Sequence, residues 1–188
     1  MLSALRTRSA PSVRPFVNLP VVSCCLFLVA CGGSGAPAKP VAVRICDGAQ
    51  GAAAATTGSP VSGAIVNRDP ANLECALTGR RLQVRLVSQT SAQAYIEFDT
   101  ETSHQSQVFG PGVHEPGQIP RAISVPGAVA AVWIPAQREL VATSGSPTHG
   151  GSYVTVTIRD HPGQRAAALA LAQAVARATF AAHPGTSS

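Results

Sequence analysis

Two stretches of the chain, 81–88 and 153–159, alternate between hydrophobic and polar residues. Successive side chains of a β-strand point to opposite faces, so this period of two predicts two strands that are buried on one face and solvated on the other. Half-buried strands of this kind are typical of an antiparallel sheet. The positions predicted to face the core are Leu82, Val84, Leu86, Val154, Val156 and Ile158.

Less regular hydrophobic runs predict three further strands, at 73–78, 128–134 and 139–144. Gly79 and Arg80 are predicted to form the turn that leads into the strand at 81–88. The segment 110–120 contains three glycines and three prolines, which predicts a loop.

A helix is predicted at the C-terminal end of the domain, where hydrophobic residues recur every three to four positions. It opens at Asp160-His161-Pro162, with Asp160 as its cap, and runs to Ala182. Pro184 and Gly185 end it. Its hydrophobic stripe includes Ala168, Leu171, Val175 and either Ala178 or Thr179.

Two other segments are predicted to be helical. An alanine-rich helix at 49–57 is expected to begin at a cap, Asp47, and to stop at Gly58. Residues 91–107 fit either a strand, by alternation, or a helix capped by Ser91, and we prefer the helix.

Together these elements predict an α+β fold, an antiparallel sheet packed on one face by helices, including the C-terminal helix. A single domain is expected at 41–183, followed by a tail at 184–188. Hydrophobic residues make up 45% of the chain but aromatic residues only 4%, so the core should consist largely of valine, leucine and isoleucine.

Residues 1–30 have the pattern of a secretion signal. Three arginines and no acidic residue in the first fifteen positions precede an apolar run from Phe16 to Ala30. A permanent membrane span needs roughly 20 residues, so this run is short for one.

Leu28-Val29-Ala30-Cys31-Gly32 resembles the lipobox of bacterial lipoproteins. In that family a diacylglycerol is attached to the cysteine thiol, and a peptidase cuts before the cysteine. The resemblance implies that 1–30 is a lipoprotein signal peptide and that Cys31 is lipidated. Ordinary cleavage and an uncleaved anchor are the alternatives.

The segment 31–40 is rich in glycine, serine and proline and is predicted to be a flexible tether. Removal of the three leader arginines lowers the formal net charge from +5 to +2. So weak a charge argues against nucleic-acid binding, which needs a concentrated basic face. The expected partners are the membrane, through the lipid on Cys31, and an unidentified envelope protein or ligand, with the domain at the extracytoplasmic face of the cell membrane.

Cysteine usage predicts one disulfide. Of the five cysteines, Cys24 and Cys25 leave with the leader and Cys31 takes the lipid, so Cys46 and Cys75 remain. Two cysteines in an exported domain most often pair. The chain contains no Cys-x-x-Cys motif that would indicate a metal or redox site instead.

No motif for catalysis, metal binding or a cofactor is recognisable, and none of these is predicted. Arg80, Arg81 and Arg85 form the only basic cluster and are interpreted as a solvated strand face, with contact to lipid headgroups or to an acidic wall polymer as the alternative. The single tryptophan, Trp133, is interpreted as core and not as a ligand-stacking platform. The histidines are each predicted to lie on the solvated surface: His104, His114, His149, His161 and His183.

The order of these parts resembles a large actinobacterial family of lipoproteins with a domain of unknown function. The matching parts are Cys46 with the helix at 49–57, Glu74-Cys75-Ala76, the segment Pro126-Gly127-Ala128-Val129-Ala130-Ala131-Val132-Trp133, and the alanine-rich helix at 166–182. Leu77 stands where that family has an aromatic residue. The resemblance implies an envelope lipoprotein and supports the predicted fold, but it carries no catalytic residues to this chain.

Three functions are compatible with these features. The preferred one is a membrane-anchored envelope lipoprotein with a non-catalytic binding or adaptor domain, whose contact surface would lie on the loops 110–120 and 144–151. The first alternative is a carrier or sensor of a small or apolar ligand held between sheet and helices. The second is an envelope hydrolase, which needs a nucleophile and base that the sequence does not reveal.

Overall fold

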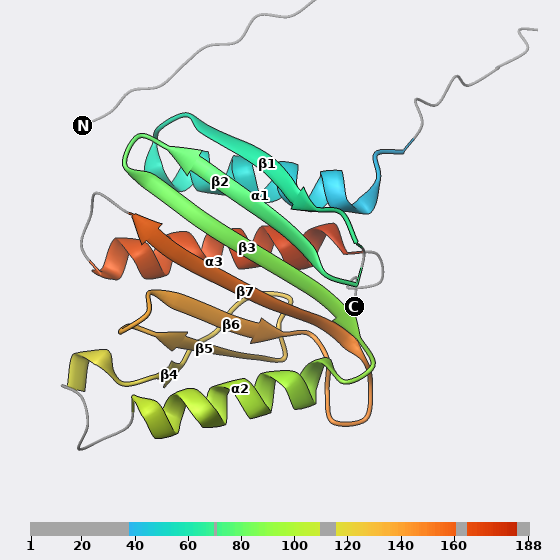
Figure 1. Cartoon of the computed structure of the whole chain (residues 1–188), viewed down its shortest axis with the longest axis vertical. Helices are drawn as coiled ribbons and strands as arrows, with labels where there is room; N and C mark the ends of the chain where they lie inside the picture. Colours follow the sequence, from blue (N-terminus) through green and yellow to red (C-terminus); the bar gives the residue numbers. More distant parts are fainter. Residues whose placement is uncertain (1–37, 70, 110–115, 161–164, 184–188) are drawn as a thin grey trace, which may run out of the picture. The chain divides into compact units, whose positions relative to one another are not determined.

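The two alternating stretches form the long central strands of a seven-stranded antiparallel sheet (Figure 1). β3 (Leu82–Ser91) and β7 (Gly151–Asp160) pair with one another, and the predicted inward residues of both strands are buried. This computed structural model describes residues 38–69, 71–109, 116–160 and 165–183.

Shorter strands extend the sheet on both sides of the central pair. β2 (Leu73–Gly79) and β1 (Val61–Asn67) follow beyond β3. β6 (Glu139–Thr143), β5 (Ala130–Ile134) and the two-residue β4 (Arg121–Ala122) follow beyond β7. The strand order is β1-β2-β3-β7-β6-β5-β4, and every neighbouring pair is antiparallel.

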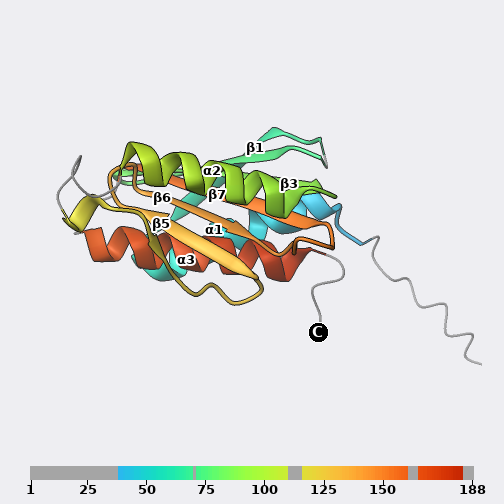
Figure 2. The ribbon, with the colours of Figure 1, turned by 90° about the horizontal axis from the view of Figure 1, so that it is seen from below.

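Three α-helices pack against this sheet, which confirms the predicted α+β class. α1 (Val41–Thr57) and α3 (Arg165–Ala182) lie side by side against one face. α2 (Ala94–Val108) lies against the opposite face, over β6 and β7 (Figure 2). α2 confirms the helix preferred for residues 91–107, although it begins at Ala94, and Ser91 is the last residue of β3 and not its cap. It lies on the face opposite to the other two helices because β5 and β6 also present Ile134 and Val141 to that side.

The main core lies between the sheet and the layer of α1 and α3. Leu171 and Val175 of α3 are fully buried against the inward residues of the strands, and Trp133 belongs to the same core, as predicted. A smaller cluster on the other face joins Phe98 of α2 to Ile134 and Val141. Both faces of β5 and β6 are therefore covered.

The prediction of a helix at 49–57 is wrong about where the helix begins. α1 starts at Val41, and Asp47 is not its cap but lies inside it. The Asp47 carboxylate instead accepts a hydrogen bond from Lys39 Nζ at 2.7 Å. The buried positions that follow helical spacing are Ile45, Cys46, Ala49 and Ala53.

The C-terminal helix is confirmed, but its predicted cap is wrong. Asp160 is the last residue of β7, and α3 begins at Arg165. Residues 161–164, where the prediction opened the helix, lie outside the described residues. Thr179, and not Ala178, completes the buried stripe, and its hydroxyl donates a hydrogen bond to the Val175 carbonyl at 2.9 Å.

β1 has no counterpart in the sequence prediction. Val61 is the only buried residue of this strand, and Ser62, Gly63 and Ala64 are all exposed, so no alternation marks it. Pairing with β2 at the edge of the sheet holds it in place. Tertiary context and not local pattern makes this segment a strand.

Candidate functional site

The hydrophobic stripe on the inner face of β3 gives way to polar residues, and the core is hollow there. Leu82, Val84 and Leu86 are buried beneath the helices, but the next inward positions are Ser88 and Thr90. A cavity of about 1240 Å³ opens at this end of the sheet. The space between sheet and helices is thus filled along its middle, with this large cavity at one end and a smaller one of about 310 Å³ at the other, between the end of α1 and the start of α3.

α1 lines the cavity with its first residues, and the α3 side contributes His183, which directly follows that helix. The first turn of α1 and the end of α3 lie at the same end of the domain, beside the end of β3 (Figure 1). Ends of β1 and β2 and the segments before β5 and at the start of β7 complete it. The lining residues are Pro40, Val41, Ala42, Val43, Ile45, Ile65, Arg68, Ala71, Leu73, Ser88, Thr90, Gly127, Ala128, Val129, Ser144, Gly150, Gly151, Ser152 and His183.

Most of this lining is apolar. Ile45 and Leu73 are buried parts of the main core, and Ile65 packs against that core. Val41 and Val129 keep 39% and 62% of their surface exposed. Concave, mostly apolar sites with a few convergent polar groups are the usual form of small-molecule binding sites.

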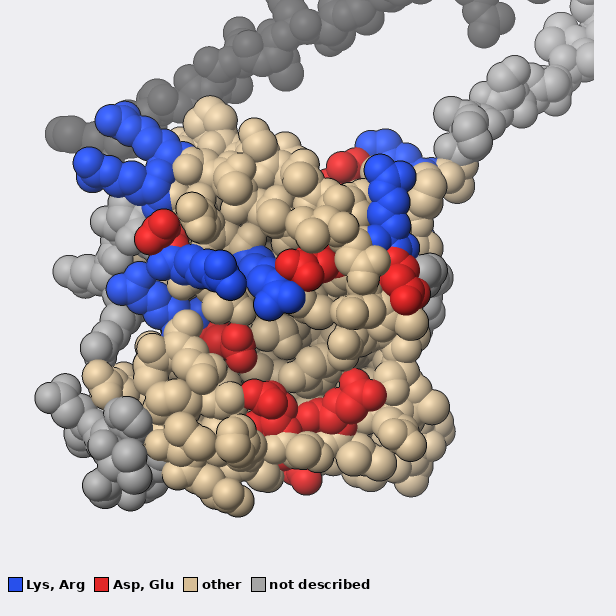
Figure 3. Space-filling model, in the orientation of Figure 1, with Lys and Arg blue, Asp and Glu red and all other residues tan. Residues whose placement is uncertain are grey.

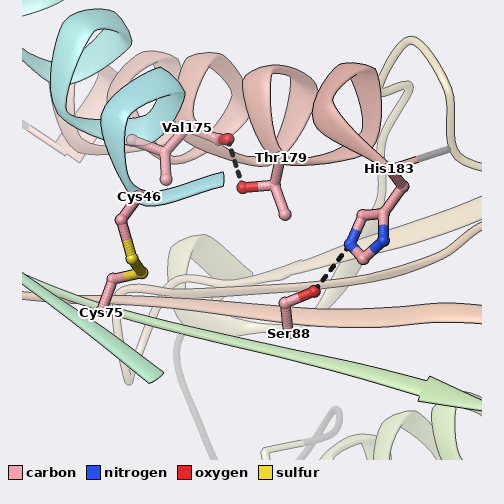
Figure 4. Close-up of a disulfide and its surroundings, with 6 residues drawn as sticks. All are labelled: Cys46, Cys75, Ser88, Val175, Thr179 and His183. Atoms are coloured by element: carbon pink, nitrogen blue, oxygen red, sulfur yellow. Dashed lines mark hydrogen bonds between the residues drawn. A yellow bond between two sulfur atoms is a disulfide. The ribbon is translucent and has the colours of Figure 1, made fainter. Parts of the chain in front are cut away.

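One pair of polar side chains from distant parts of the chain meets in the cavity. Ser88 Oγ lies 2.9 Å from His183 Nε2, although the two residues are 95 positions apart (Figure 4). Ser88 is 1% exposed and comes from the inner face of β3, whereas His183 directly follows α3. The hydrogen bond ties the end of α3 to the sheet and satisfies the buried hydroxyl.

The prediction that His183 is a solvated surface residue is wrong. Its ring is half-buried in the cavity wall. Burial, and secondarily the positive charge of Arg44, lowers the pKa of His183 below its usual value near 6.5. The imidazole is therefore neutral at pH 7 and presents a polar but uncharged surface.

In its described part, the cavity offers one candidate general base, His183, and no group of metal ligands. None of its described lining residues is Asp or Glu. Among the residues that the structure describes, no three His, Cys, Asp or Glu side chains are grouped so that they could hold a metal ion.

The predicted disulfide between Cys46 and Cys75 is confirmed. It joins α1 to β2, with a Cα–Cα distance of 5.9 Å, and both cysteines are buried in the main core (Figure 4). Cys46 is adjacent to the cavity-lining Ile45, so the bond fixes the α1 wall against the sheet. The predicted lipidation site, Cys31, lies outside the described residues.

One of the two loops predicted to carry recognition contributes to the cavity. In the loop 144–151, Ser144 N–H donates to the Ser152 carbonyl and Ser152 N–H donates to Ser144 Oγ, both at 2.9 Å. These bonds close the loop at its base, where Ser144 and Gly151 line the cavity. In the other predicted loop, residues 110–115 lie outside the described part.

Close packing at the base of this loop should make the protein's stability sensitive to a single added methyl group at Gly151. A Cβ on Gly151 would lie 2.6 Å from Gly145 Cα and 2.8 Å from the carbonyl carbon of Ser144, so backbone must move. We expect Gly151→Ala to lower the free energy of unfolding by about 1–3 kcal/mol, as overpacking usually does. Chemical denaturation of the variant and the unmodified protein measures this difference in the free energy of unfolding.

Gly51→Ala is the matched control, because a Cβ there meets nothing within 4 Å on helix α1. Alanine is the better helix former, so this variant should gain about 0.5–1 kcal/mol. Equal stabilisation of both variants would show that Gly145 and Gly151 are not in close contact.

Five other residues considered in the sequence, His104, His149, Arg80, Arg81 and Arg85, do not line the cavity. His104 and His149 are exposed, as predicted, whereas His114 and His161 lie outside the described residues. Arg85 is on the solvated face of β3 and forms a salt bridge with Glu74, with Nε–Oε1 at 2.8 Å. Figure 3 shows acidic side chains gathered over α2 and basic ones near the turn between β2 and β3, which Arg80 and Arg81 form.

Comparison with known protein families, with curated proteins and with solved structures finds no match to this chain. No helix among the described residues is long and apolar enough to cross a membrane.

Proposed function

We propose that the protein is a membrane-anchored envelope lipoprotein whose domain binds a small apolar ligand in the cavity beside β3. The observation that carries this proposal is the large, mostly apolar cavity at one end of the main core. Its volume of about 1240 Å³ exceeds the roughly 300–1,000 Å³ of typical ligand sites, so a ligand of considerable length fits. This favours a carrier or sensor over an adaptor that acts through its outer loops alone.

The proposed anchor would keep the cavity close to the membrane. With a lipid on Cys31, the nine residues 32–40 span at most about 30 Å even when fully extended. They end at Pro40, which itself lines the cavity. An apolar ligand that leaves the bilayer would therefore have a short path to the site.

The Ser88–His183 pair serves in this proposal as a polar patch of the wall and not as a nucleophile and base. Ser88 lies within β3, which is paired with β2 on one side and β7 on the other, so the backbone N–H groups around it are used in the sheet. Acyl transfer needs free donors that stabilise an oxyanion next to the nucleophile. A hydrolase is accordingly the less supported function.

The proposal predicts saturable binding of a neutral, polarity-sensitive fluorophore such as N-phenyl-1-naphthylamine. The chain expected after cleavage, residues 31–188, would be used with Cys31→Ser, so that neither the lipid nor the apolar run 16–30 is present and no detergent is needed. We expect Ala128→Phe to weaken binding roughly tenfold or more, because the new ring occupies the cavity from its wall. Fluorescence titration gives the dissociation constants, and thermal melting checks the fold.

Ala122→Phe provides the control, because Ala122 is exposed on β4 and does not line the cavity. Binding should survive that change. No saturable fluorescence with the Cys31→Ser chain, or equal losses in both phenylalanine variants, would contradict ligand binding in the cavity.

A further inference from the structure

One charged side chain lies in the described lining of the cavity, and it is basic. Arg68, which lies just beyond the end of β1, is the only Lys, Arg, Asp or Glu among the described lining residues. It is exposed and forms no salt bridge with a described carboxylate, whereas Lys39 and Arg85 both do. The adjacent Asp69 uses its Oδ1 to accept a hydrogen bond from the Ala71 N–H at 2.9 Å.

Other groups add positive potential at the same end of the domain. Arg44 lies on α1 close enough to His183 to influence its titration. No side chain caps the N-terminus of α1, where Pro40 holds the cap position, and this positive end of the helix dipole also borders the cavity. A negative group at the Arg68 side would therefore meet complementary charge.

The apolar surface begins next to Arg68. Ile65 precedes it by three residues at the end of β1, and Leu73 of β2 and Ile45 of α1 continue the wall inward. A long apolar chain can leave water along this wall while a charged group stays at Arg68. The arrangement is that of an amphiphile site, with one polar end and one apolar body.

Building on the proposed ligand-binding function, we propose that the cavity binds a single acyl chain that carries an anionic head group, with the head group at Arg68 and the chain along the apolar wall. Fatty acids and single-chain phospholipids share this chemistry. The head group distinguishes them, because one carries a carboxylate and the other a phosphate.

The test is competition against the neutral fluorophore, with the same Cys31→Ser chain of residues 31–188 at low ionic strength. The competitors have the same twelve-carbon chain and different head groups: dodecanoate, dodecyl phosphate, dodecanol and dodecyltrimethylammonium, each below its micellar concentration. At least one anion should bind roughly fivefold more tightly than the alcohol, the upper range for an exposed ion pair. The cation should bind most weakly, and added salt should reduce the anion's advantage.

Arg68→Gln should remove the preference for the anion and leave the affinities for dodecanol and the fluorophore unchanged. Arg68→Lys should retain most of the preference for the anion. Arg121→Gln should leave that preference unchanged, because Arg121 is exposed and does not line the cavity. Each methylene added to the anion should tighten binding about fourfold until the apolar wall is covered.

The outcomes separate the two proposals. If the fluorophore binds but dodecanol and the anions compete equally well, or if Arg68→Gln weakens all ligands alike, the anionic head group is wrong and the apolar site stands. If neither the fluorophore nor any twelve-carbon ligand binds, both proposals fail. A stronger preference for carboxylate assigns a fatty acid, and one for phosphate assigns a single-chain phospholipid.

Discussion

Replacing both Cys46 and Cys75 with alanine should lower the free energy of unfolding by about 3–4 kcal/mol. The disulfide closes a loop with a sequence separation of 29 residues, and the chain-entropy relation gives roughly this value for such a loop. Loss of two buried sulfur atoms adds to the effect. For a domain of this size we expect the melting temperature to fall by about 10 °C.

The same change should also loosen the cavity. Cys46 holds the first half of α1 against β2, and Val41, Ala42 and Ile45 of that half line the site. The double variant should therefore bind the fluorophore more weakly even at temperatures below its melting temperature, where it is still folded. Reduction of the unmodified protein under mildly denaturing conditions should reproduce the loss of stability. Equal denaturation midpoints for the oxidised, reduced and double-alanine proteins would contradict a structural role for the bond.

Leu171→Ala should lower the free energy of unfolding by a similar amount, about 3–5 kcal/mol. Leu171 is fully buried at the centre of the α3 stripe, between Ala168 and Val175, where neighbouring small residues leave little that can move to fill the space. Large-to-small substitutions at such sites lose both the transfer free energy and the cost of the remaining cavity. Urea denaturation, with the slope checked for two-state behaviour, measures the loss.

Leu169→Ala is the matched control on the same helix. Leu169 is only partly buried, so the identical substitution, with the same change in helix propensity, should cost less than half as much. If both variants lost the same stability, α3 would not be docked through the face that contains Leu171.

The sequence pattern was sufficient where burial follows a strict period. Leu82, Val84 and Leu86 in β3, and the equivalent positions in β7, alternate because each central strand has a buried and a solvated face. The stripe of α3 is visible for the same reason. β1 escapes prediction because it is an edge strand with one buried residue, so its pairing partner and not its own sequence defines it.

The cavity could be predicted only in part. Its single local signal is the change from leucine and valine to Ser88 and Thr90 on the inward side of β3, which marks where the apolar core stops. His183 gives no signal, because it follows an alanine-rich helix and meets Ser88 only through the packing of α3 on the sheet. Arg68 likewise has no motif around it, and only the cavity formed by its spatial neighbours identifies it as a candidate ligand contact.

The most direct test of the central claim is to map where an apolar ligand binds. A twelve-carbon fatty acid with a photoreactive diazirine at the end of its chain would be crosslinked to the Cys31→Ser chain of residues 31–188, and the modified residues identified by mass spectrometry. Ligand binding in the cavity predicts labelling of lining residues such as Ile45, Ile65 and Ala128, abolished by excess dodecanoate. Labelling confined to residues outside this lining, or labelling that excess dodecanoate does not reduce, would contradict it.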